Sequence, residues 1–187
     1  MLLGMKTGLA WVGILGAAAL GFGCEPPKPP AHWQQGGAVL VLPRARWVRG
    51  DVTVDLFPQG QVLVDGDHVL SLDAAGRVFE PNGTPVALLE PDGAVVGRGN
   101  EDLGTVGAVT AARRGQQVAW LALQPSGEVV LFGRRGQTRP LGVWVGCGSA
   151  PRVQQACVLL SHLLAEQLLE RPADPPVTFG VGIGVGF

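Results

Sequence analysis

Apolar positions recur through the middle of the chain as a five-copy pattern, Leu-x-x-x-Gly-x-Val. The copies begin at Leu56, Leu72, Leu89, Leu103 and Leu123. Sequences such as Pro-Asp-Gly and Pro-Ser-Gly within them favour a type I turn that glycine completes in the left-handed conformation. We therefore expect the leucine and valine of each copy to face each other as the first pair across two antiparallel strands.

A second set of turn signals separates the copies. These signals are Asp65-Gly66, Pro81-Asn82-Gly83, Gly99-Asn100, Arg113-Arg114-Gly115 and Arg134-Arg135-Gly136. Each unit is thus a strand, a turn, a strand and a second turn, which is typical of a β-meander. About ten short strands would form a wide sheet that curls or closes. The pattern predicts an all-β fold, an antiparallel β-meander of hairpin repeats forming a curled sheet or an open barrel.

The spacing of the apolar positions changes over residues 151–170. Val153, Cys157, Leu160 and Leu164 recur at spacings of three and four, and Arg171-Pro172 ends the run. The glutamines, glutamate, Ser161 and His162 fall on the other side. This pattern predicts one C-terminal amphipathic α-helix, serving as a lid over the open face of the sheet or as a docking face for another protein.

The last eleven residues, Val177–Phe187, alternate apolar side chains with glycine. Alternation at period two predicts a C-terminal strand. It would pair with a sheet edge in its own chain, or add to a partner protein by strand addition.

The first 23 residues read as a signal peptide. Lys6 is followed by an uncharged, apolar stretch to Gly23, with small residues before a cleavage position. An uncleaved membrane anchor is the alternative, because 17 uncharged residues reach the lower limit of a spanning helix. Either arrangement places the remainder of the chain outside the cytoplasm.

Cys24 ends that apolar stretch, directly after Gly23, and Glu25 separates it from a proline-rich run over residues 26–30. This arrangement resembles the lipobox-type signal of bacterial lipoproteins, with a divergent lipobox. The resemblance implies that Cys24 becomes the N-terminus and carries lipid such as palmitate. Residues 24–37 would then form a Pro-rich tether, and residues 38–187 the hairpin-repeat domain. The implied location is the cell envelope, on the periplasmic or surface side of the outer membrane.

Composition narrows the function classes further. With 47% hydrophobic residues the chain can build a core, although 29 glycines and 15 prolines bring it close to low-complexity composition. A formal net charge of −1 argues against a nucleic-acid partner that needs a basic face.

Two cysteines remain once Cys24 is set aside. Cys147 follows an apolar strand, and Cys157 lies on the apolar stripe of the helix. In an oxidising compartment we expect a Cys147–Cys157 disulfide, with two buried free thiols as the alternative.

Candidate chemistry is sparse. Cys157 and His162 are five apart, which does not place them on one helix face, and His32 and His68 are distant from both. No metal-ligand spacing is present, so we expect no catalytic residues, no metal and no cofactor. The acidic turns 65–67 and 100–102 are expected to be solvated hairpin tips rather than calcium loops. Arg44, Arg46 and Arg49 form a small basic–aromatic cluster with Trp47, and these arginines are expected to be ordinary surface residues.

These features together predict an exported, lipid-anchored cell-envelope protein that is not an enzyme and acts as a binding or structural module. Two alternatives stay open. One is an apolar small-molecule carrier, in which the curled sheet encloses a ligand and the helix covers its mouth. The other is an accessory partner of an outer-membrane assembly, an envelope protein complex, that docks through the C-terminal strand.

Overall fold

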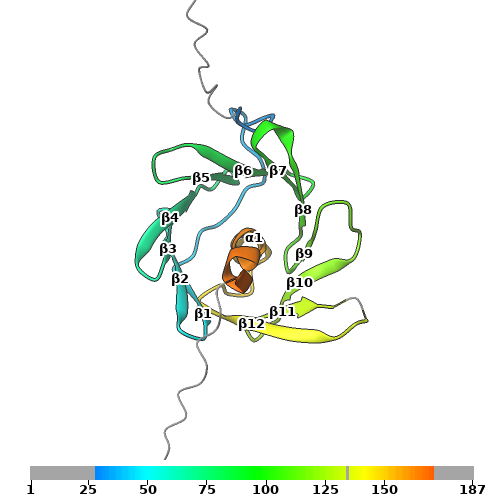
Figure 1. Cartoon of the computed structure of the whole chain (residues 1–187). Coiled ribbons are helices and arrows are strands. Elements are labelled where there is room, and N and C mark those ends of the chain that lie inside the picture. Colours follow the sequence, from blue (N-terminus) through cyan, green and yellow to red (C-terminus); the bar gives the residue numbers. More distant parts are fainter. Residues whose placement is uncertain (1–27, 134, 171–187) are drawn as a thin grey trace, which may run out of the picture.

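The computed structural model describes residues 28–133 and 135–170, the last five by their backbone only. Twelve antiparallel strands follow one another around a closed barrel, and one α-helix follows them (Figure 1). The predicted all-β fold with a C-terminal helix is confirmed. The strands are β1 (Ala45–Arg49), β2 (Val52–Leu56), β3 (Gln61–Val64), β4 (Asp67–Leu72), β5 (Arg77–Phe79), β6 (Pro85–Leu89), β7 (Ala94–Gly97), β8 (Asp102–Val106), β9 (Thr110–Ala112), β10 (Ala119–Leu123), β11 (Glu128–Phe132) and β12 (Thr138–Val145).

The first and last strands close the barrel. β1 pairs with β12 in antiparallel register, with Arg46 opposite Val145 and Val48 opposite Val143. The sheet therefore closes completely instead of remaining an open barrel, and closure removes the exposed edges that a wide sheet would otherwise carry.

The repeated leucines and valines form the expected pairs. Leu56 lies opposite Val62, Leu72 opposite Val78, Leu89 opposite Val95, and Leu123 opposite Val129. All eight side chains are buried. The copy that begins at Leu103 differs: its first pair is Val106 with Ala111. Four of the five copies thus have the predicted geometry.

The repeat glycines lie at one end of the barrel, which we call the glycine-turn end. Gly60 has φ +92°, and its carbonyl accepts a hydrogen bond from the Leu72 amide of the next unit at 2.8 Å. A Cβ at Gly60 would collide with the Leu72 carbonyl oxygen. The same bond to the next unit recurs at Gly76, Gly93 and Gly127. Glycine is therefore required both for its backbone conformation and for the close contact between neighbouring turns.

The other connections, β1–β2, β3–β4, β5–β6, β7–β8, β9–β10 and β11–β12, lie at the opposite end, which we call the loop end. The hairpins flare outward there, as the loops around the rim of Figure 1 show. The β7–β8 connection contains a short 3₁₀ helix, η1 (Arg98–Asn100).

Helix α1 (Pro151–Glu170) has the predicted bounds, but it lies inside the barrel (Figure 1). The expectation of a lid over an open sheet face is therefore wrong. The expected polar face is also wrong at Ser161 and His162, which are only 1% and 7% exposed. A helix surrounded by strands has no solvent face along its buried turns, so its polar side chains need partners within the protein.

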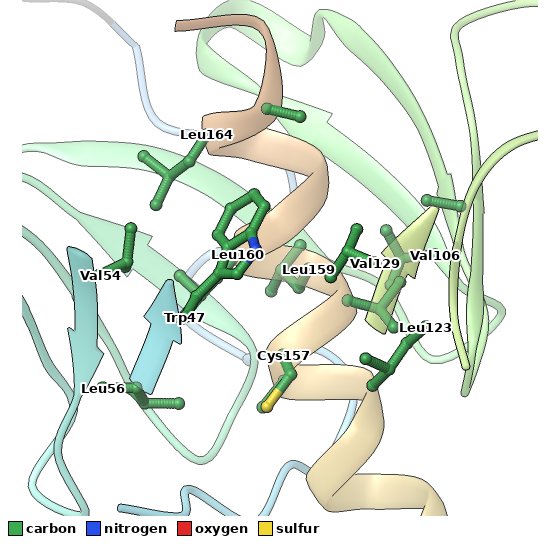
Figure 2. Packing of buried hydrophobic residues seen from close by; sticks show 14 of the residues in the cluster. Trp47, Val54, Leu56, Val106, Leu123, Val129, Cys157, Leu159, Leu160 and Leu164 are labelled. Carbon is green, nitrogen blue, oxygen red and sulfur yellow. The ribbon is translucent and has the colours of Figure 1, made fainter. Parts of the chain in front are cut away.

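The core forms around this helix. Figure 2 shows Leu159, Leu160 and Leu164 of α1 among side chains that come from strands on different sides of the barrel. Trp47 and Leu56 are among these strand residues, and both are at most 1% exposed. The continuous apolar run on β10 is buried from Trp120 to Leu123. The helix thus supplies the apolar surface that the inward faces of the strands require.

The segment before β1 packs on the barrel. The ring of Trp33 meets that of Phe79 edge to face at 5.4 Å, and Pro30 is buried. Further along, the Ala38 amide donates to the carbonyl of Leu89 at the end of β6, and the Leu40 amide donates to that of Ala74 in the β4–β5 connection. The expected tether, residues 24–37, is therefore attached to the barrel from Lys28 onward.

The signal peptide, Cys24 and the C-terminal strand 177–187 lie outside the described residues and stay predictions. Within the described residues, no helix combines the length and apolar character needed to cross a membrane.

Candidate functional site

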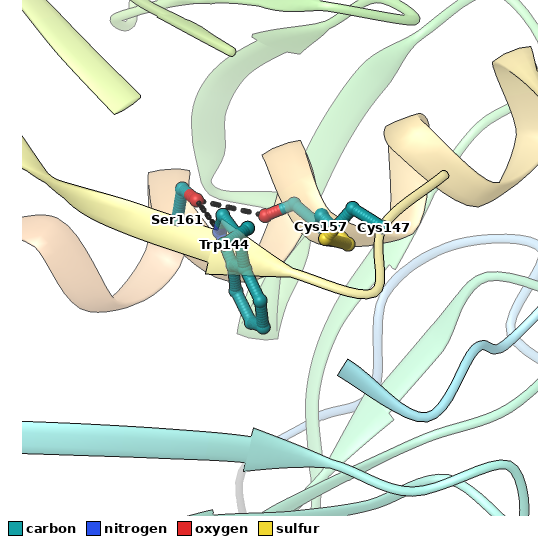
Figure 3. Close-up of a disulfide and its surroundings, with 4 residues drawn as sticks. All are labelled: Trp144, Cys147, Cys157 and Ser161. Atoms are coloured by element: carbon teal, nitrogen blue, oxygen red, sulfur yellow. Dashed lines mark hydrogen bonds between the residues drawn. A yellow bond between two sulfur atoms is a disulfide. The ribbon is translucent and has the colours of Figure 1, made fainter. Parts of the chain in front are cut away.

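A disulfide joins α1, the helix inside the barrel, to the strand that precedes it; we call α1 the plug helix. Cys147 follows β12 and Cys157 lies in α1, and the expected bond between their sulfur atoms is present (Figure 3). Their Cα atoms are 6.3 Å apart, and both side chains are buried. The bond fixes the point at which the chain leaves the barrel wall and enters its interior.

A tryptophan of the same strand holds the next turn of the helix. The indole Nε1–H of Trp144 donates to Ser161 Oγ at 2.8 Å, and Ser161 Oγ donates to the carbonyl of Cys157 at 2.8 Å (Figure 3). The ring of Trp144 also stacks on Trp47 of β1, with centroids 5.6 Å apart. Ser161 is therefore a buried anchor of the helix to the wall.

His162 makes the matching anchor on the other side. Trp120 Nε1–H donates to His162 Nδ1 at 2.9 Å, and His162 Nε2 lies 2.8 Å from the Leu103 carbonyl. Because Nδ1 accepts, the ring proton must be on Nε2 for both bonds to form. The imidazole is thereby held as the neutral Nε2–H tautomer between β10 and β8.

These contacts leave Cys157 and His162 without the groups that a cysteine–histidine nucleophilic site needs. The sulfur of Cys157 is bound to Cys147, and both nitrogens of His162 are engaged with the barrel wall. A catalytic cysteine needs a thiolate, and a general base needs a nitrogen that can take a proton. Buried polar residues of α1 thus serve to position the helix.

A groove of about 750 Å³ lies at the loop end, between the β9–β10 and β11–β12 hairpins. β10 and β11 pair only over Leu121–Leu123 and Val129–Leu131, and the groove is lined by Leu131 at the end of that ladder and by residues beyond it. Its lining residues are Arg113, Gln116, Gln117, Val118, Ala119, Trp120, Leu131, Phe132, Gly133, Gln137, Thr138 and Arg139. The opening is thus a consequence of the flare of the hairpins.

The groove combines apolar and cationic surface. Val118 is 75% exposed, and Phe132 is 37% exposed. The guanidinium of Arg113 lies over the ring of Trp120, 4.2 Å from its centroid, and Arg139 is exposed on the other hairpin. Exposed apolar side chains flanked by guanidinium groups suit a ligand with an apolar part and a negative charge.

Charge is unevenly divided along the chain. Residues 103–165 contain six arginines and one carboxylate, Glu128, whereas residues 28–102 contain six basic and ten acidic side chains. Four of those arginines, all exposed, lie around the groove on the two hairpins: Arg113, Arg114, Arg135 and Arg139. The net charge of −1 therefore conceals a basic half and an acidic half.

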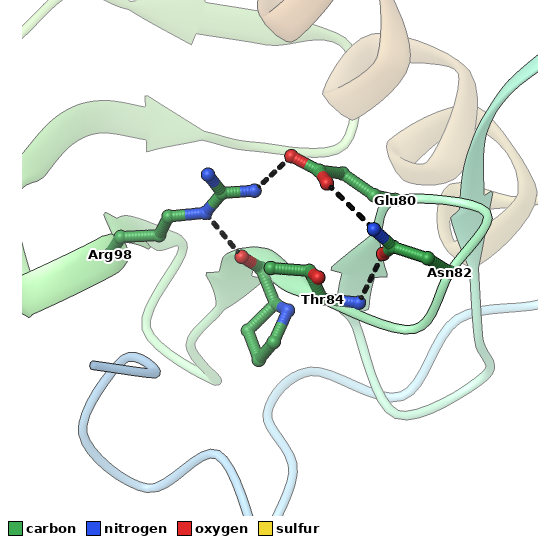
Figure 4. Close-up of polar contacts among 5 residues, drawn as sticks. Glu80, Asn82, Thr84 and Arg98 are labelled. Carbon is green, nitrogen blue, oxygen red and sulfur yellow. Dashed lines mark hydrogen bonds and ion pairs between the residues drawn. The ribbon is translucent and has the colours of Figure 1, made fainter. Parts of the chain in front are cut away.

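On the other half, three arginines form ion pairs with carboxylates: Arg46, Arg77 and Arg98. Figure 4 shows Arg98 bonded through its guanidinium to the Glu80 carboxylate, which also accepts from Asn82. The Asn82 carbonyl oxygen in turn accepts from the amide of Thr84 at 2.8 Å. The hydrogen bond from Arg98 lowers the pKa of Glu80 below its usual value. This network braces the β5–β6 turn against η1.

The remaining residues singled out from the sequence are dispersed. His32 lies 3.2 Å from Glu90, and His68 bonds to Ser71. No group of three or more histidine, cysteine or acidic side chains capable of holding a metal occurs in the part of the chain that the structure describes. In the expected basic–aromatic cluster, Trp47 points into the core, and Arg46 pairs outside with Asp55 at 2.7 Å, which raises the pKa of Arg46.

Sequence reasoning missed the groove. The two Arg-Arg-Gly triplets were visible as turn signals, but not as one surface. The sequence did contain a signal for this basic surface: the two triplets belong to adjacent predicted hairpins, and few carboxylates lie near them in the sequence.

No protein-family model, no curated protein and no solved structure matches this chain. The function must therefore be argued from the fold and the groove.

Proposed function

We propose that this chain is an exported protein of the cell envelope, anchored to a membrane through lipid on Cys24, and that it acts as a non-enzymatic binding module. The predicted leader supports export, and the position of Cys24 between that leader and the proline-rich run 26–30 supports lipidation. A disulfide between Cys147 and Cys157 supports it, because such bonds persist in oxidising compartments.

The observation that carries the binding role is the groove between the two hairpins. It presents Val118 and Phe132 to solvent on a barrel whose interior is occupied by α1. Exposed apolar surface flanked by polar groups marks interaction sites, because covering it with a partner removes apolar area from water. The small-molecule carrier alternative loses support, because α1 fills the space that an enclosed ligand would need.

Metabolic labelling with an alkyne analogue of palmitate, followed by membrane fractionation, tests the anchor. We expect the full chain to be labelled and membrane-bound, and the variant C24A to lose the label. C147A/C157A is the matched control and should retain it. An unlabelled chain found in the cytosol would overturn the proposal.

The non-enzymatic role has its own test. The purified full chain is screened for hydrolysis of ester, amide and glycoside substrates. We expect no turnover. Activity that is abolished in H162N while the fold is retained would show that the buried histidine is catalytic.

A further inference from the structure

The chain reaches the barrel at the loop end. The Gly99 amide donates to the Lys28 carbonyl at 2.9 Å, and the Ala31 amide donates to Asn100 Oδ1 at 2.6 Å. Both partners belong to η1 in the β7–β8 connection. The point where the described chain begins is therefore on the same end as the groove.

Cys24 precedes Lys28 by only four residues. An extended chain spans at most about 3.5 Å per residue, so this connection reaches no further than about 14 Å. A lipid on Cys24 would then place the β7–β8 connection within about one to two Debye lengths of the membrane surface. The loop end, rather than the glycine-turn end, would face the lipid.

The β9–β10 loop next to this connection, and the β11–β12 loop after it, have the chemistry of a membrane contact. Arg113 and Arg114 lie between β9 and β10, and Arg135 lies between β11 and β12. All three are exposed, and Val118 projects beside them. Guanidinium groups bind phosphate oxygens in a two-pronged geometry, and an exposed apolar side chain can enter the interfacial layer.

We propose that the loops carrying Arg113, Arg114 and Arg135 bind the anionic phospholipid headgroups of the membrane that holds the anchor. This inference rests on the proposed function and adds the partner of the groove. Glu101 and Asp102, at the β7–β8 connection, lie next to the tether, and an anionic surface repels their carboxylates. The barrel therefore tilts so that β9–β12 approach the membrane and the acidic hairpins turn away from it. The groove then opens onto the bilayer.

Hydrogen–deuterium exchange on the full chain in vesicles tests this orientation. The chain is reconstituted in vesicles of phosphatidylcholine alone or with about 30% phosphatidylglycerol, a strongly anionic surface. We expect exchange in peptides covering 113–118 and 135–139 to slow several-fold only with the anionic lipid. Roughly 0.5 M salt should reverse the effect through screening.

Charge-matched variants separate the loops from general attraction. R114Q/R135Q should abolish the protection, because each arginine near an anionic surface contributes about fivefold to attachment. R44Q/R152Q removes the same charge from the glycine-turn end and should leave the protection unchanged. The exposed loop positions are suited to substitution, and unchanged exchange in the core strands verifies the fold.

Each other outcome overturns the inference. Equal exchange in both vesicles, or protection that survives R114Q/R135Q, excludes headgroup binding by these loops. Protection by inorganic phosphate with phosphatidylcholine alone indicates a site for a free anion. The two proposals fail in distinguishable ways. A lipidated chain without protection overturns headgroup binding and leaves the proposed anchor intact, whereas protection in a chain without lipid on Cys24 contradicts the anchor and not headgroup binding by these loops.

Discussion

Trp120 and His162 lie 42 residues apart in sequence, and their side chains share a 2.9 Å hydrogen bond inside the barrel. The bond joins β10 to the plug helix, and the other histidine nitrogen joins the helix to β8. The Trp144–Ser161 bond joins the preceding helix residue to β12. Because Ser161 and His162 are held by strands on different sides of the barrel, α1 cannot rotate about its own axis.

Replacing His162 by leucine should destabilise the protein. H162L leaves the buried indole N–H of Trp120 opposite a side chain that accepts no hydrogen bond, and the Leu103 carbonyl loses a donor. We expect a loss of about 2–4 kcal/mol in the free energy of unfolding. Urea denaturation of the full chain measures it. H68L, at an exposed histidine, is the control and should change stability by less than about 0.5 kcal/mol. Equal effects in the two variants would contradict the anchoring role.

Breaking the Cys147–Cys157 bond should loosen the helix. The bond closes a loop with a sequence separation of 10 residues, and a loop of that size stabilises a fold by about 2–3 kcal/mol through the unfolded state. We expect C147S/C157S to lower the melting temperature, and a reducing agent to lower that of the original chain but not of the variant. A reductant effect of equal size on both proteins would show that the bond is not its target.

The repeat glycines should tolerate no side chain. Gly60 and Gly66 share φ +92°, but a Cβ meets the Leu72 carbonyl only at Gly60 and open space at Gly66. We expect G66A to cost about 1 kcal/mol through backbone strain alone. G60A should cost at least about 2 kcal/mol more, since two backbones must separate. Thermal unfolding of both variants isolates the turn-to-turn contact, and similar values would exclude it.

The Glu80–Arg98 pair should give a pH-dependent increment of stability. Arg98 lowers the pKa of Glu80 in the folded protein, while the unfolded value is near 4.3. The increment is therefore fully present above about pH 4.3 and disappears as pH falls through the lower folded value. The melting temperatures of the original chain and E80Q should differ near neutral pH and converge in acid. E128Q serves as the control for loss of a carboxylate, and a difference that grows in acid would contradict the sign.

Local signals accounted for much of the fold. The Leu–Val pairs flanking Gly60, Gly76, Gly93 and Gly127 were predicted because a turn and its adjacent strand residues interact over a few positions. The bounds of α1 were predicted for the same reason: Pro151 and Arg171-Pro172 limit the helix from within its own sequence. Cys147 and Cys157 could be paired because Cys147 ends a strand and Cys157 lies in the second turn of the helix that follows it closely.

The errors arose where the partner was distant in sequence. Ser161 and His162 were expected on a polar face, because helical periodicity separates polar from apolar side chains. It does not show that a tryptophan on a distant strand will donate a hydrogen bond to each of them. The groove was missed because it exists only where two hairpins diverge. Arg113 and Arg135 lie on one surface only because the barrel places their two hairpins side by side.

The amino-acid sequence by itself determined the hairpins, the helix and the disulfide, since turn geometry and side-chain spacing act within a few residues. Only the tertiary structure decided that β1 meets β12, that the helix occupies the interior, and that Arg113, Arg114, Arg135 and Arg139 gather at the loop end. Those features depend on the accumulated twist and curvature of twelve strands, and the energy that selects them comes from contacts between residues far apart along the chain.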